Sequence, residues 1–367
     1  MNLQADSLNR RQWSVAVSQH AAVLYVAAIA QRAFSDEPPA DAQSKPQVLA
    51  ELVRLKQDAP DHYLIGQNIG SSNHQIQRGY DAYFAKLSES IGKMPAVLAV
   101  DYGYDQIGPG IAATNDLLIE HARQGGLVTI SFHPPNPWRG TTCNDVKAGS
   151  VDVLLQPGTA ANRRWLGMLD RIAAGLKQLQ EAGVCVLFRP LHEMNGDWFW
   201  WSRDERQQPL PRDTYIRLWH HLHDYLKKDC QLDNLLWVYS PSARYDANQL
   251  SLSAYYPGDD RVDVVGLDYY GDPMEDLLHD SLVELARYSK PLAICEFGFS
   301  NRDSHQHDNL RLVRALKQHD VSVQYVVYWH SWKTTRVAII DHHNADSLMR
   351  HPNVVTRSEY RISNVEC

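Results

Sequence analysis

The sequence predicts an α/β fold, a single-domain (β/α)8 TIM barrel, and three observations support this prediction. The length of 367 residues and a hydrophobic content of 44% suit one large barrel. Eight short apolar runs recur along the chain, and stretches with helical periodicity separate most of them. No glycine-rich phosphate-binding loop follows the first run, which disfavours an open doubly wound sheet.

The predicted strands alternate with predicted helices, and this order is typical of strands that pair in parallel. We expect the strands at Tyr63–Gln67, Ala96–Asp101, Leu127–Phe132, Val184–Phe188, Leu235–Tyr239, Val262–Leu267, Pro291–Cys295 and Val323–Tyr328. We expect helices at Asp81–Ile91, Ala112–Gln124, Asn162–Ala182, Asp213–Lys228, Met274–Tyr288 and Gln306–His319. Repetition of this unit predicts a closed barrel.

Polar and aromatic residues gather where the predicted strands end, whereas the strand starts show no such gathering. These segments are Asp101–Asp105, His133–Trp138, Arg189–Asn195, Asp268–Tyr270, Glu296–Gly298 and Trp329–His330. Because the carboxyl ends of barrel strands meet at one rim, we expect these side chains to lie close together. The pattern therefore predicts a functional site at this rim.

The N-terminal segment differs from the rest of the chain. Arg10 and Arg11 precede an apolar run at Ala21–Ala30 that ends in small residues, so we expect an export signal peptide over residues 1–30. The run is too short to be a stable membrane anchor. The twin-arginine and general export routes both stay open, and a helix packed on the barrel is the alternative. We expect residues 31–55 to form a linker or N-terminal extension, and residues 56–367 to form the barrel.

Charge and residue usage exclude several classes of function. The net charge is −7 without a basic run, so we expect no nucleic-acid partner. The 5 cysteines have no paired spacing and predict no disulfide framework. His192 and Glu193 do not start a zinc-protease motif, because position 196 is Gly. We therefore expect no metal and no cofactor, and we expect a monomer.

The segment from Phe188 to Trp201 reads FRPLHEMNGDWFWW and follows an apolar strand. After Phe188 it combines charged groups with four aromatic rings, those of Trp198, Phe199, Trp200 and Trp201, and this mixture is costly to bury without partners and therefore indicates a site. The segment resembles the acid/base motif of glycoside hydrolase family 26, which is best known for β-mannanases. The resemblance implies that Glu193 is the general acid/base and that Arg189, His192 and Trp198 belong to the active site. We expect two of the four aromatic rings to be core.

Glycoside hydrolysis requires two carboxyl groups beside one glycosidic bond, one protonated and one ionised. Glu296 ends strand seven in PLAICEFG, which resembles a second motif of the family, and it is the candidate nucleophile. Strands four and seven face each other across a barrel mouth, which favours retention, at about 5 to 5.5 Å, over inversion, at roughly 6.5 to 9.5 Å. We expect burial to raise the pKa of Glu193, and Arg189 and Tyr270 to donate hydrogen bonds to Glu296.

Three further residues gain a role from the resemblance. His133 is similar to a histidine that contacts the sugar next to the cleaved bond, and a structural histidine is the alternative. Trp329 resembles the platform beneath the reacting sugar, since a flat apolar ring suits one face of a pyranose. Trp138 could serve an outer subsite or could simply pack on a loop.

The resemblance covers the chain from about Tyr63 to Tyr360 and implies an endo-acting, retaining hydrolase of β-1,4-mannans. The same mechanism acting on mixed-linkage β-1,3-1,4-glucan or on β-1,3-xylan is an alternative. A non-catalytic carbohydrate-binding barrel is an alternative of another class, although it would not need both Glu193 and Glu296. The expected partner is a polysaccharide, and the expected location is secreted or periplasmic.

Overall fold

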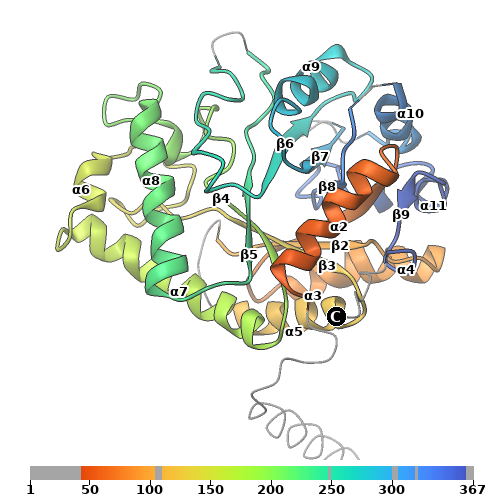
Figure 1. Ribbon diagram of the computed structural model, residues 1–367, viewed down its shortest axis with the longest axis horizontal. Coiled ribbons are helices and arrows are strands. Elements are labelled where there is room, and N and C mark those ends of the chain that lie inside the picture. The colour runs from red at the N-terminus through yellow and green to blue at the C-terminus, as the bar shows by residue number, and fades with distance from the viewer. Residues whose placement is uncertain (1–42, 104–109, 247–248, 300–304, 319–320, 361–367) are drawn as a thin grey trace, which may run out of the picture. The chain divides into compact units, whose positions relative to one another are not determined.

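The structure is a computed structural model, and it describes residues 43–103, 110–246, 249–299, 305–318 and 321–360 (Figure 1). The export signal expected at residues 1–30 lies outside the described residues, as do Tyr104 and Asp105. Within the described part of the chain, no helix combines the length and the apolar character that crossing a bilayer requires.

Eight parallel strands close into a barrel, which confirms the predicted fold class. The strands are β1 (Tyr63–Ser71), β2 (Val97–Asp101), β3 (Leu127–Phe132), β4 (Val186–Pro190), β5 (Leu235–Tyr239), β6 (Val264–Tyr270), β7 (Leu292–Gly298) and β8 (Tyr325–Tyr328). Each strand pairs with its successor, and β1 pairs with both β8 and β2, so the sheet has no break between its first and last barrel strands. A short strand, β9 (Val354–Val355), adds to the start of β1.

Helices connect the strands, as the alternation predicts. They are α3 (Ile76–Gly79), η1 (Tyr80–Ala85), α4 (Lys86–Ile91), α5 (Ile111–Arg123), α6 (Val151–Leu155), α7 (Ala160–Glu181), α8 (Arg212–Asp224), η3 (Tyr225–Asp229), α9 (Asp276–Leu285), α10 (Leu310–Gln318) and α11 (Ala345–Met349). Two short 3-10 turns lie at Trp200–Ser202 and Ile339–Asp341. The segments η1 and η3 are π-helical turns inside helices that the sequence predicts as continuous.

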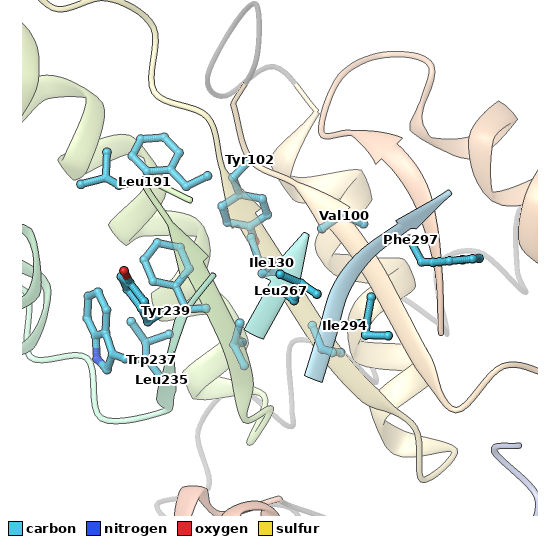
Figure 2. Packing of buried hydrophobic residues seen from close by; sticks show 14 of the residues in the cluster. Val100, Tyr102, Ile130, Leu191, Leu235, Trp237, Tyr239, Leu267, Ile294 and Phe297 are labelled. Carbon is cyan, nitrogen blue, oxygen red and sulfur yellow. The ribbon is translucent and has the colours of Figure 1, made fainter. Parts of the chain in front are cut away.

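Side chains of the barrel strands alternate between two apolar layers, because successive residues of a strand point to opposite faces. Val97 and Ala99 of β2 belong to the cluster inside the barrel. Leu98 and Val100 belong to the outer cluster, which the connecting helices cover. Figure 2 shows part of this outer cluster, with Val100 and Ile130 projecting from neighbouring strands. Every residue of β2, β3, β4 and β5 is buried, as expected for a parallel sheet covered on both faces.

Helix α2 (Lys45–Asp58) precedes the barrel and corrects one expectation. The side chain of Ser44 accepts a hydrogen bond from the backbone N–H of Gln47, and the side chain of Gln47 accepts one from the backbone N–H of Ser44, which forms a capping box. We expect residues 31–55 to form a linker or N-terminal extension, and from Lys45 onward the chain is a helical extension, not an unstructured linker. Pro46 favours the first turn of a helix here, where its missing N–H costs nothing.

Candidate active site

The inward side chains of the barrel change from apolar to polar toward the carboxyl ends of the strands. On β2 the inward residue after Ala99 is Asp101, and on β4 the inward residue after Leu187 is Arg189. Among the described residues, seven buried charged or imidazole groups meet at this end: Asp101, His133, Arg189, His192, Glu193, Asp268 and Glu296. The structure thus confirms, for the described residues, that these polar side chains gather at the carboxyl rim, and the functional site there stays a prediction.

Glu193 lies directly after β4 on a sharply turned backbone. Leu191 has φ +50° and Glu193 has φ +54°, a left-handed conformation that non-glycine residues rarely adopt and that costs about 1–3 kcal/mol each. The turn is held because the N–H of Glu193 donates to the carbonyl of Ser240 at 2.8 Å. The indole of Trp201 donates to the carbonyl of His192 at 2.8 Å. These contacts fix the direction in which the carboxyl group of Glu193 points.

The carboxyl group of Glu193 lies in surroundings that favour its protonated form. Its side chain is buried, and the indole Nε1–H of Trp198 donates to its Oε2 at 2.5 Å. Burial raises the pKa of Glu193 to about 7, and the nearby negative charge of Glu296 adds to this effect. The hydrogen bond from Trp198 acts in the opposite direction. A carboxyl group with this pKa is suited to giving and then taking back a proton near neutral pH.

A β-bulge in β7 aims Glu296 into the barrel. The pairing registers of β7 with both β6 and β8 shift between Ile294 and Phe297. As a result, Cys295 belongs to the inner apolar cluster while the next residue, Glu296, also points inward and contacts Arg189 of β4. No sequence signal marks this bulge, because the continuous apolar run PLAIC leads into it without a glycine.

Two donors hold the carboxylate of Glu296. A guanidinium N–H of Arg189 donates to Oε1, and the hydroxyl of Tyr270 donates to Oε2 at 2.7 Å. Both donors were predicted from the sequence, and the structure brings both to Glu296. Charge-assisted hydrogen bonds of this kind favour the ionised form of a carboxylate. Glu193 and Glu296 therefore lie in surroundings that favour opposite protonation states.

Asp268 of β6 shares Arg189 with Glu296, a contact that the sequence did not predict. A second guanidinium N–H of Arg189 donates to Oδ2 of Asp268 at 2.6 Å, and the hydroxyl of Ser240 donates to Oδ1 at 2.7 Å. Burial raises the pKa of Asp268, and the cation of Arg189 opposes this rise. The two carboxyl groups together fix both arms of the guanidinium and hence the position of the donor to Glu296.

Glu193, Asp268 and Glu296 each have one carboxyl oxygen within 4.8 Å of the other two. This upper limit is compatible with the separation of about 5 to 5.5 Å in retaining glycosidases and is shorter than the roughly 6.5 to 9.5 Å in inverting ones. His133, His192 and Glu296 form an overlapping set within the same limit, so both sets have the spacing of possible metal ligands. Arg189 supplies one positive charge that is shared by Asp268 and Glu296. The expectation of no metal stays a prediction.

His133 and His192 form a directly contacting pair beside Glu296. Their Nε2 atoms lie 2.9 Å apart, and Nε2 of His192 lies 3.5 Å from Oε1 of Glu296. On its other side, Nδ1 of His133 lies 2.6 Å from Oδ2 of Asp101. Burial lowers the pKa of His192 well below its usual range, and the charge of Arg189 acts in the same direction. His192 is therefore neutral.

The predicted aromatic residues divide into two groups. Trp329 closes β8 at the site, with the guanidinium carbon of Arg189 5.9 Å from the centre of its ring. Trp138 packs edge-on against Trp200 with ring centres 5.3 Å apart, as in the packing alternative, and a role at an outer subsite stays a prediction. Of the four rings at positions 198–201 three are buried, one more than expected, and only Trp198 is partly exposed.

Tyr245 is a further residue at the mouth that sequence reasoning missed. It lies on the segment between β5 and β6, and its hydroxyl accepts a hydrogen bond from the backbone N–H of Tyr270 at 2.5 Å. Its side chain is 45% exposed, which is unusual for a large ring beside two buried carboxyl groups. The only sequence signal was its position six residues after the end of a predicted strand.

Comparison with known proteins gives one consistent result. The sequence profile of glycosyl hydrolase family 26 matches residues 38–359. A mannan endo-1,4-beta-mannosidase A and B from Caldalkalibacillus mannanilyticus is 38% identical over 256 residues, which are 66% of this chain and 48% of that protein. A mannan endo-1,4-beta-mannosidase from Bacillus subtilis is 34% identical over 259 residues, 66% of this chain and 69% of that protein. This chain thus spans about half the length of the first relative and about two thirds of the second.

A solved structure of a Bacillus subtilis mannanase superimposes with a TM-score of 0.74 at 27% sequence identity. The superposition covers 89% of this chain and 96% of that one. The similarity therefore extends over most of the chain.

Proposed function

The chain belongs to glycosyl hydrolase family 26 and is a glycoside hydrolase, and from this premise we propose that it cleaves β-1,4-mannosidic bonds within mannans with retention of configuration. The observation that carries the proposal is the pairing of Glu193 and Glu296. Their carboxyl oxygens lie within 4.8 Å, and their neighbours favour a protonated Glu193 and an ionised Glu296. A double displacement needs this combination of distance and charge.

In the first step, the carboxylate of Glu296 attacks the anomeric carbon of the sugar while Glu193 gives its proton to the glycosidic oxygen. The bond between the anomeric carbon and that oxygen breaks, and an ester between the sugar and Glu296 forms. Arg189 and Tyr270 hold Glu296 in line for the attack. Because these donors are already in place, little reorganisation accompanies the step.

In the second step, Glu193 acts as a base. It takes a proton from water, the water oxygen attacks the anomeric carbon, and Glu296 leaves as a carboxylate. Esterification removes the negative charge of Glu296, which is one of the causes that raise the pKa of Glu193. The pKa of Glu193 therefore falls in the intermediate, and this fall prepares the ionised form that the second step requires.

The stereochemistry and the substrate are tested together. When β-1,4-mannan is digested in the spectrometer, proton NMR should show the β-anomer of the new reducing ends first, followed by slow mutarotation. An initial α-anomer would contradict double displacement. Parallel digests of galactomannan, lichenan and β-1,3-xylan decide the substrate class, because faster cleavage of either of the last two would favour the alternative substrates. Binding to mannan without any turnover would favour a non-catalytic barrel.

We also propose that the protein is exported and acts outside the cytoplasm. Arg10 and Arg11, the apolar run at Ala21–Ala30 and its small-residue ending support this proposal. A polysaccharide too large to enter a cell is the expected substrate, which is consistent with an extracellular or periplasmic enzyme. Intact-mass measurement of protein recovered outside the cytoplasm should show a chain that lacks residues 1–30. Recovery there of a chain that still begins at Met1 would argue against cleavage.

A further inference from the structure

Asp101 is a buried carboxylate beneath the active site, and it contacts no reacting group directly. It lies at the carboxyl end of β2 and accepts three hydrogen bonds. The N–H of Gly103 donates to Oδ1 at 2.8 Å, and the hydroxyl of Ser131 donates to Oδ2 at 2.5 Å. Nδ1 of His133 lies 2.6 Å from the same Oδ2. Although burial opposes ionisation, the contacts with His133, Ser131 and Gly103 together lower the pKa of Asp101.

The charge of Asp101 determines which nitrogen of His133 carries a proton. An ionised carboxylate can only accept hydrogen bonds, so Nδ1 of His133 must be the N–H donor. In neutral His133 the other nitrogen, Nε2, is then an acceptor. Nε2 of His192 lies 2.9 Å away, and only one proton fits between two nitrogens at this distance. The N–H of this pair therefore belongs to His192.

The N–H of His192 also faces the nucleophile, because the same Nε2 lies 3.5 Å from Oε1 of Glu296. Nδ1 of His192 is buried and has no hydrogen-bond partner among the described residues. The backbone carbonyl of Arg189 also acts on this ring and raises the pKa of His192, against the larger effect of burial. The series of contacts thus runs from Asp101 through the imidazoles of His133 and His192 to Oε1 of Glu296.

We propose that Asp101 is a positioning residue, which sets the tautomers of His133 and His192 and so turns an N–H rather than a lone pair toward Glu296. The proposal rests on the proposed function only in that Glu296 is taken as the nucleophile. The tautomers themselves follow from hydrogen bonding in the free protein and can be measured without any substrate.

Replacing Asp101 with Asn should reverse the direction of the hydrogen bonds that run from residue 101 through His133 to His192. The carbonyl oxygen of Asn must face the N–H of Gly103, because the alternative orientation would place two N–H donors against each other. The amide NH2 then faces Nδ1 of His133, which becomes an acceptor, and the proton of His133 moves to Nε2. His192 must accept that proton at Nε2, so its lone pair faces Oε1 of Glu296 and its own proton moves to the unpartnered Nδ1.

Other charged groups surround the two imidazoles. Glu193, Glu296 and Arg189 lie on the catalytic side, and His330 at the end of β8 responds to the charges of both Asp101 and His133. None of these groups lies within the pair of contacts that join Asp101, His133 and His192, so none of them fixes which nitrogen carries the proton. A substitution at Asp101 therefore tests the tautomers of His133 and His192 separately from the electrostatic effect of these surrounding charges.

The experiment measures histidine nitrogen-15 shifts of the full chain at mildly alkaline pH, where an unperturbed imidazole is neutral. The signals are assigned by their loss in His133→Gln and His192→Gln. Unsubstituted protein should show a protonated Nδ1 in His133 and a protonated Nε2 in His192. Asp101→Asn should exchange these positions in both rings. The kcat/KM on mannan should fall roughly 10- to 100-fold, which is less than the ~10⁴ loss found where the mis-protonated imidazole itself transfers the proton.

Ser131→Ala is the matched control, because it removes a different hydrogen bond from the same oxygen of Asp101. It should leave both tautomers unchanged and lower kcat/KM by less than about threefold, with a melting temperature close to that of Asp101→Asn. The proposal is overturned if the unsubstituted protein shows the reverse tautomers. It is also overturned if Asp101→Asn leaves them unchanged, or if both variants lose activity equally. A protein with the expected tautomers that cleaves no glycan would contradict the proposed function alone.

Discussion

Glu193 and Glu296 carry the same functional group, and their neighbours determine what each can do. Glu193 has a single neutral donor, Trp198, whereas Glu296 has a guanidinium and a phenol. Since each carboxyl group influences the other's charge, their proton affinities cannot be assigned from either residue in isolation. The division of roles therefore depends on side chains from β4 and β6 and on the segment that follows β4.

The pH dependence of kcat/KM should report the protonation of Glu193. Since its pKa is raised to about 7, the acid form is present below that pH and is lost above it, so kcat/KM should fall about tenfold per pH unit on the alkaline side. The hydrogen bond from Trp198 lowers the pKa of Glu193. Trp198→Phe should therefore move the alkaline limb to higher pH. An unchanged or acid-shifted limb would show that Glu193 is not the titrating acid.

Small-molecule rescue should separate the two carboxyl groups. Glu193→Ala should still form the covalent intermediate from an activated aryl mannoside, whose leaving group needs no proton, and should then stall. Glu296→Ala should lose even the first step. Azide should restore turnover in both variants, giving a β-azide with Glu193→Ala and an α-azide with Glu296→Ala. Product NMR identifies the anomers, and the opposite pairing would mean that the two roles are reversed.

The two candidate catalytic carboxyl groups and the two donors to Glu296 could be predicted from the sequence, but the contact of Arg189 with Asp268 could not. Glu193, Arg189 and Glu296 each follow an apolar run, and this position marks the end of a barrel strand. The sharing of Arg189 between Asp268 and Glu296 depends instead on how neighbouring strands approach inside the barrel. Sequence spacing within one strand carries no information about such contacts between strands.

At the scale of elements, the segment after β4 is held by its neighbour after β5. Nδ2 of Asn195 donates to the carbonyl of Ser242 at 2.7 Å, and the N–H of Ser242 donates to Oδ1 of Asn195 at 2.9 Å. Both residues are buried, so each group needs this partner. This reciprocal pair supports the strained turn that carries Glu193.

Asn195→Ala should loosen that turn. The buried N–H and carbonyl of Ser242 lose their partners, which should cost about 1–3 kcal/mol of stability for each group. A displacement of Glu193 by about 1 Å can lower kcat by on the order of 100-fold. Steady-state kinetics and urea unfolding measure the two effects.

Asn234→Ala is the control for this loss, because Nδ2 of Asn234 donates to the carbonyl of Val184 at 3.0 Å, near the opposite end of β4. It should lower stability by about 1 kcal/mol and leave kcat unchanged. Equal losses of kcat in both variants would mean that the pair between Asn195 and Ser242 does not position Glu193.

The strands could be predicted more accurately than their ends. The predicted starts of β1, β3 and β5 are correct, because apolar runs mark them clearly. Strands β1, β6 and β7 continue three or four residues beyond the predicted ends, through Ser71, Tyr270 and Gly298. There the backbone ladder continues while the side chains turn polar, because those side chains line the site. Hydrophobic periodicity thus fails where function replaces apolar packing.

Across the whole barrel, the two ends of the strands differ in composition and in role. The carboxyl ends hold charged groups close together, while the other end is filled with apolar side chains from the strands and from α2. Val48 and Leu52 of α2 are fully buried in the inner cluster together with Leu64 and Val97. The sequence does not distinguish the two roles of a proline here, because Pro46 fits both a linker and the first turn of a helix.

This division predicts that stability and catalysis can be changed separately. Leu52→Ala should leave a cavity beneath the inner cluster and lower the free energy of unfolding by about 2–5 kcal/mol, measured by urea unfolding. The kcat measured well below the melting temperature should stay within about twofold, because Leu52 packs with the strand starts rather than with Glu193 or Glu296. Leu250→Ala is the stability control, since Leu250 is 40% exposed and its loss should change stability by less than about 0.5 kcal/mol. A large fall in kcat for Leu52→Ala would mean that packing at the base of the barrel sets the geometry of the two carboxyl groups, and the ends would then not be independent.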